Sequence, residues 1–149
     1  MKTLTVAEFT EALDQVVQER GPDYVYQKEA GGDCFYSTPD GQPDCVVGAV
    51  LAKIAPEVFE SLALLEAEVD DGNGGLCRAP AGGIIKFVRG YGDDEDARYA
   101  PHHLMEAESR DLAQALLALQ TSQDVGETWG EARREFIGRL RSKAELVAA

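Results

Sequence analysis

The stretch DCFYSTPDGQPDCVVGAVLAKI, residues 33–54, joins three kinds of local structure and therefore decides how the chain folds. Its first residues, 34–37, alternate in character and are rich in aromatic side chains, which is typical of a β-strand. Pro39 and Gly41 then mark a turn, because proline fixes φ and glycine tolerates positive φ. Asp44 stands where an N-cap is expected, immediately before an apolar helical segment. The stretch predicts a strand, a turn and a helix start.

The preceding run DYVYQ, residues 23–27, also alternates and is rich in aromatic residues. The segment 29–33, EAGGD, lies between the two runs, so we expect them to form a β-hairpin. In the helix that follows, Gly48, Ala49 and Ala52 are small, so a neighbouring backbone could approach it closely.

Helix signals surround this hairpin. Thr5 and Glu8 form a capping box for a first helix that Gly21 ends. A second capping box, Thr128 with Glu131, opens the last helix. A helix from Pro56 is expected to carry one apolar side made of Phe59, Leu62, Leu65 and Val69. We therefore predict one α+β domain over residues 1–149, in which a small antiparallel hairpin or sheet packs against about four to five helices. The last two of these helices should form a C-terminal antiparallel helical hairpin. Residues 66–108 form an acidic middle segment of this domain.

The formal net charge of the 149 residues is −13, which disfavours direct binding to nucleic acids or anionic membranes. The hydrophobic fraction of 44% is that of a folded chain rather than a disordered one. Apolar runs are too short to span a bilayer, and the N-terminus lacks the features of a signal peptide. These features predict a soluble cytoplasmic protein.

Cys34 and Cys45 raise the question of catalysis. Their spacing misses the close pairs of a zinc site, even with Cys77 and the adjacent His102 and His103. Cys45 lies at a predicted helix N-terminus, where the helix dipole favours the thiolate form of a cysteine. A redox pair of Cys34 and Cys45 therefore stays open as an alternative. The favoured interpretation is that both pack where the hairpin meets the helix. Nucleotide-binding and hydrolase motifs are also lacking, so the sequence predicts no catalytic residue, metal or cofactor.

Acidic side chains are concentrated in the middle of the chain: residues 57–96 hold ten acidic residues and three basic ones. Such a face could steer a basic partner onto the chain. The predicted interaction surface consists of Glu66, Glu68, Asp70, Asp71, Asp93, Asp94, Glu95 and Asp96.

Several motifs together resemble a family of small uncharacterised proteins of actinobacterial phages and prophages. These are YVY at 24–26, Cys-x-Tyr at 34–36, Gly-x-Pro-x-Cys-x-x-Gly at 41–48 and QDVGETWGEA at 123–132. The resemblance implies no biochemical activity. It implies that the protein is made by a phage or prophage and is located in the cytoplasm of an infected actinobacterium. The leading hypothesis is a non-enzymatic phage accessory protein that binds a host protein with a basic surface, acting as a nucleic-acid mimic. Alternatives are a small thiol- or metal-dependent enzyme using Cys34 or Cys45 with His102 or His103, and a virion or assembly component that self-associates, for example as a homodimer.

Overall fold

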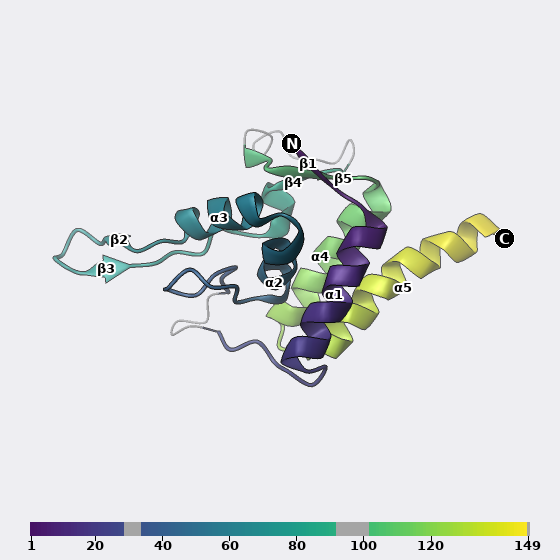
Figure 1. The fold of residues 1–149 in the computed structure, drawn as a ribbon, viewed down its shortest axis with the longest axis horizontal. Helices are drawn as coiled ribbons and strands as arrows, with labels where there is room; N and C mark the ends of the chain where they lie inside the picture. Colours follow the sequence, from purple (N-terminus) through teal and green to yellow (C-terminus); the bar gives the residue numbers. More distant parts are fainter. Residues whose placement is uncertain (29–33, 92–101, 149) are drawn as a thin grey trace.

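The computed structural model describes residues 1–28, 34–91 and 102–148 of the chain (Figure 1). Within these residues, helices pack beside a small sheet that lies at one edge of the molecule, and the predicted α+β class is confirmed (Figure 1). The helices are α1 (Val6–Arg20), α2 (Val46–Ile54), α3 (Pro56–Leu65), α4 (Arg110–Asp124), α5 (Trp129–Ala148) and the 3₁₀ turn η1 (Ile84–Lys86). The strands are β1 (Lys2–Leu4), β2 (Val69–Asp70), β3 (Leu76–Cys77), β4 (Val88–Arg89) and β5 (Met105–Ala107).

The main sheet is parallel, with strand order β1–β5–β4. In its register, Met105 lies between Lys2 and Val88, and the side chains of Met105, Val88 and the neighbouring Leu4 are fully buried. Parallel strands need long connections, and α1, α2 and α3 lie in the chain between β1 and β4. The sheet brings the N-terminus, the middle segment and the start of the C-terminal third together.

The predicted N-caps of the first and last helices, Thr5 and Thr128, are confirmed. The Thr5 hydroxyl accepts a hydrogen bond from the Glu8 backbone N–H at 3.1 Å, and Gly21 ends α1 at a φ of 104°. The Thr128 hydroxyl likewise accepts from the Glu131 N–H at 3.0 Å, and the Glu131 carboxylate accepts from the Thr128 N–H at 3.3 Å. Both caps satisfy backbone donors that a helix start leaves open.

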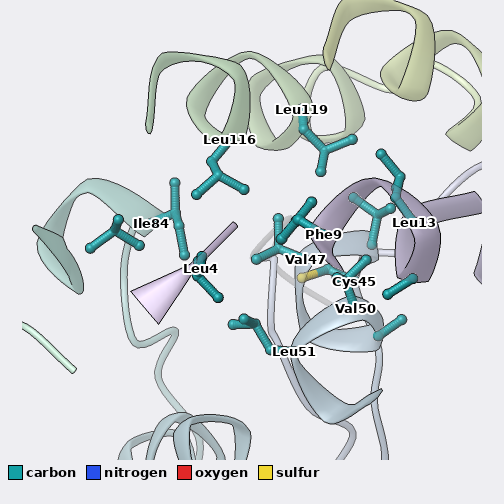
Figure 2. Close-up of a cluster of buried hydrophobic side chains, with 14 of the residues drawn as sticks. Leu4, Phe9, Leu13, Cys45, Val47, Val50, Leu51, Ile84, Leu116 and Leu119 are labelled. Atoms are coloured by element: carbon teal, nitrogen blue, oxygen red, sulfur yellow. The ribbon is translucent and has the colours of Figure 1, made fainter. Parts of the chain in front are cut away.

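The core lies where α1, α2 and α4 meet (Figure 2). Phe9 and Leu13 of α1 face Val47 and Val50 of α2. Leu116 of α4 is buried on another side of this cluster. Helix α5 runs back along α4, as the predicted helical hairpin requires, and its Phe136 packs on Phe9 with ring centroids 5.3 Å apart (Figure 1).

The prediction that residues 24–27 pair with residues 34–37 in a hairpin is wrong: in the described residues these two segments do not pair with each other. Val25 bridges Thr128, and Ser37 bridges Pro43, so the two segments pair with other partners. The predicted link 29–33 lies outside the described residues. The segments meet instead through one side chain, because the Tyr26 hydroxyl accepts from the Phe35 N–H at 2.9 Å.

The predicted cap of α2 is off by one residue. Cys45 is the N-cap, and its sulfur accepts from the Gly48 N–H at 3.3 Å. The Asp44 carboxylate instead accepts a hydrogen bond from the Tyr26 hydroxyl at 3.0 Å. The turn before it forms as predicted, with Gly41 at a φ of 84° and the Gly41 N–H donating to the Thr38 carbonyl.

Candidate functional site

Cys34 and Cys45 line one pocket of about 260 Å³ at the N-terminal end of α2. Gln120 and Asp124 of α4 contribute polar groups to its lining. The Gln120 amide donates to the Tyr36 hydroxyl at 2.9 Å, and this hydroxyl donates to a backbone carbonyl at 2.7 Å. The two cysteines therefore meet at the junction of the extended segment and the helix, as the sequence predicts.

Cys45 is unsuited to act as a nucleophile. Its side chain is buried, and Figure 2 shows its sulfur among hydrophobic side chains. Burial raises the pKa of this thiol well above its ordinary value and outweighs the hydrogen bond from the Gly48 N–H. Since the thiolate is the reactive form, a buried neutral thiol is inert. Cys45 is a packing and capping residue.

The histidines are not part of this pocket. His102 is exposed and His103 half-buried, and both precede β5. Neither lines the pocket that holds Cys34 and Cys45. In the part of the chain that the structure describes, no three His, Cys, Asp or Glu residues gather closely enough to hold a metal ion.

Glu66 does not belong to the predicted acidic surface, because its side chain is fully buried. Its carboxylate accepts hydrogen bonds from the backbone N–H groups of Tyr36 and Ser37, each at 3.0 Å, and from the Ser37 hydroxyl at 2.7 Å. These donors belong to the extended segment, which forms no strand of either sheet in the described residues. Glu66 therefore fastens the end of α3 to residues 36 and 37.

Arg78 completes this buried network. Its guanidinium donates to the Ser37 carbonyl at 2.7 Å and to the Glu66 carbonyl at 3.1 Å, and it stacks 4.2 Å from the centre of the Phe35 ring. Its charge is therefore directed inward. Glu66 and Arg78 together fix the root of the segment that follows α3.

That segment forms an arm, β2 with β3, which projects away from the helices (Figure 1). In the antiparallel register, Val69 lies opposite Cys77 on one face and Asp70 opposite Leu76 on the other. All four side chains are exposed. An isolated two-stranded ribbon is marginally stable in water, so an arm with both faces exposed is suited to a partner.

The acidic residues at the tip of the arm stabilise its turn. Asp70 accepts from the Gly72 N–H at 2.8 Å, and Asp71 accepts from the Asn73 N–H at 2.7 Å and the Gly75 N–H at 3.1 Å. Asp70, Asp71 and Glu68 remain exposed, as the predicted interaction surface requires. Asp93, Asp94, Glu95 and Asp96 lie outside the described residues.

Sequence reasoning missed the apolar part of this surface. Leu65 and Val69 were expected to continue the buried side of α3, but of the four residues in that predicted stripe only Phe59 and Leu62 are buried. The helix ends at Leu65, so Val69 belongs to the arm and is 59% exposed. The available signal was the pair Leu64–Leu65, which cannot both continue the stripe of Phe59 and Leu62. We define the arm surface as Leu64, Leu65, Glu68, Val69, Asp70, Asp71 and Leu76.

A groove of about 490 Å³ lies between the turn at residues 38–41 and α3. Pro39 and Gly41 line one side, and Phe59, Ala63 and Leu64 line the other. Leu64 also belongs to the arm surface, so the two features are continuous. The structure thus joins an acidic, partly apolar arm to an apolar groove.

Comparisons with known proteins assign no family to this chain: no family model, no curated protein and no solved structure matches it. None of the helices in the described ranges combines the length and hydrophobicity needed to cross a membrane.

Proposed function

We propose that this chain is a non-enzymatic binding protein that engages a protein partner through the arm surface. The observation that carries the proposal is the exposure of apolar side chains, among carboxylates, at the end of α3 and on the projecting arm that follows it. Leu64 is 77% exposed and Leu76 is 69% exposed. Apolar groups gathered on an exposed surface and rimmed by charges are typical of protein interaction sites.

The charge of the arm surface defines the partner. Glu68, Asp70 and Asp71 flank the apolar residues, and the nearby Arg78 is engaged in the buried network. A partner with a basic surface would be attracted over a distance, and apolar contacts would hold the complex. Such binding is weakened by salt but not abolished, because the apolar part does not depend on ionic strength.

The resemblance to actinobacterial phage proteins supports a setting for this binding. In that setting the chain is an accessory protein made in the cytoplasm of an infected cell, and its partner is a host protein. The alternative of thiol catalysis loses support from the burial of Cys45. Self-association through the arm surface is the competing outcome, and it would leave the bait alone in the experiment below.

The test is affinity capture from actinobacterial lysate at low and moderate salt, read by quantitative mass spectrometry. The tagged natural chain is compared with a Leu64→Ser, Leu76→Ser double variant. Val125→Ser is the matched control, because Val125 is an equally exposed apolar residue, at 71%, on another element. We expect a host protein with the natural chain and the control but not with the double variant. Identical recoveries from all three, or recovery of the bait alone, would contradict the proposal.

A further inference from the structure

The groove beside α3 has walls that are fixed before any partner arrives. Ser37, next to the turn that forms one wall, is bonded to the Glu66 carboxylate at the end of α3. Arg78 bonds to both Ser37 and Glu66 by their carbonyls. The Ser37–Glu66 contacts are buried and the Arg78 contacts are partly buried. Because these contacts join the two walls, the groove is preorganised, which lowers the cost of binding.

The groove has an apolar lining and a suitable size. Phe59, Ala63, Leu64 and Ala67 line it from α3 and its end, and Pro39 lines it from the turn. Its volume of about 490 Å³ falls in the ordinary range of binding pockets, about 300 to 1,000 Å³. The small side chains of Ala63 and Ala67 leave space that an apolar group can fill.

Two carboxylates, Asp40 on the turn and Glu60 on α3, line the groove from opposite sides. Both residues are exposed. Among the described residues that line the groove, Arg78 is the only cation, and its guanidinium is turned toward Ser37 and Glu66. An anionic occupant would be repelled by this arrangement. A positively charged one is favoured on both sides of the apolar floor.

From these features we infer that the groove binds a polypeptide segment of the partner, with one apolar side chain entering between Pro39 and Ala63 and lysine or arginine residues beside it. A polypeptide is favoured over a small molecule because the groove continues through Leu64 onto the arm surface, so an occupant can extend along both. This inference rests on the proposed function and adds the chemistry that the partner must carry.

The test is a selection from a library of random peptides on the immobilised natural chain. We expect enriched peptides that pair an apolar residue with neighbouring lysines or arginines. Ala63→Trp fills the groove and should weaken their binding at least about tenfold, a loss of about 1.4 kcal/mol. Glu60→Lys, at an exposed position that preserves the fold, should remove the preference for basic residues. Ala7→Trp, on the exposed side of α1, is the control for an added tryptophan.

Enrichment without basic residues, no enrichment, or peptides that bind Ala63→Trp as tightly as the natural chain would overturn the inference. The outcome is separable from that of the proposed function. If the captured host protein is lost by the Leu64→Ser, Leu76→Ser variant but retained by Ala63→Trp and Glu60→Lys, the groove inference fails and the arm surface stands. If the double variant retains it, the proposed function itself fails.

Discussion

Glu66 and Ser37 are joined by two hydrogen bonds to one carboxylate oxygen: the Ser37 N–H donates at 3.0 Å and the Ser37 hydroxyl at 2.7 Å. The other oxygen accepts from the Tyr36 N–H at 3.0 Å. The Glu66 carboxylate thus accepts the backbone hydrogen bonds that the carbonyl groups of a neighbouring strand would accept in a sheet. The same contact fixes the groove and the root of the arm.

Removing this carboxylate should destabilise the fold strongly. Glu66→Ala leaves two buried N–H groups without acceptors, so we expect the free energy of unfolding to fall by about 3 kcal/mol. Urea denaturation followed by circular dichroism measures the change. Glu68→Ala is the control and should stay within about 0.5 kcal/mol of the natural chain, because Glu68 is exposed. Equal stabilities of the two variants would show that the network contributes little.

Gly48 is required for the close approach of α2 to the extended segment. A Cβ at this position would collide with the Tyr36 carbonyl oxygen, which the Asp44 N–H holds at 2.9 Å. Gly48→Ala should therefore lower the free energy of unfolding by roughly 1–3 kcal/mol, despite the better helix propensity of alanine.

Gly138 of α5 is the matched control, because an added Cβ there meets nothing within 4 Å. Gly138→Ala should raise the free energy of unfolding by about 0.5–1 kcal/mol. Thermal denaturation of the pair gives the comparison. A stable Gly48→Ala variant would mean that α2 and the segment at Tyr36 are farther apart than described.

The thiols should differ in reactivity as their burial differs. Cys77 on the arm is exposed, whereas Cys45 is buried and its pKa is raised by burial. We expect a maleimide or aromatic disulfide reagent to modify Cys77 in the folded protein and Cys45 only after unfolding in urea. Peptide mass spectrometry of the modified protein reads both sites. Modification of Cys45 at the rate of Cys77 would contradict its place in the core.

Asp124 should make stability depend on pH. Burial raises the pKa of its carboxyl above the ordinary value, although hydrogen bonds from Cys34 and Gln123 lower it. The protonated form is therefore favoured in the folded chain, and the stability it contributes is complete below about pH 4, the unfolded pKa. This contribution is lost as pH rises through the raised folded pKa.

Asp124→Asn cannot ionise and so avoids this loss. The free energy of unfolding of the variant, relative to that of the natural chain, should increase from about pH 4 toward neutral pH. Parallel urea titrations over this range test it. A relative stability that is constant or falls with pH would oppose the assignment.

Much of the fold follows from short-range signals in the sequence. The caps at Thr5 and Thr128 depend on residues three positions apart, and the turn at Gly41 depends on a local φ. The parallel sheet does not follow from short-range signals, because it pairs Lys2 with Met105, about 100 residues later in the chain. Periodicity records which face is buried but not which distant strand will be its neighbour.

The candidate site shows the same division. The exposure of Glu68, Asp70 and Asp71 can be predicted from their charge, because charged side chains usually face water. Glu66 has the same character in the sequence, and only the donors at Tyr36 and Ser37 explain its burial. Tyr36 and Ser37 meet Glu66 from about 30 positions away in the chain, a tertiary contact that no local pattern contains.

The most direct test of partner binding uses the arm itself as the probe. A photoactivatable crosslinker attached to Cys77 places the reactive group on β3 of the projecting arm. The control carries the same group on α1, in a Cys77→Ser, Ala7→Cys variant. After illumination in actinobacterial lysate, we expect a dominant adduct with one host protein from Cys77 and not from the control. The same adducts from both positions, or no adduct from Cys77, would contradict it.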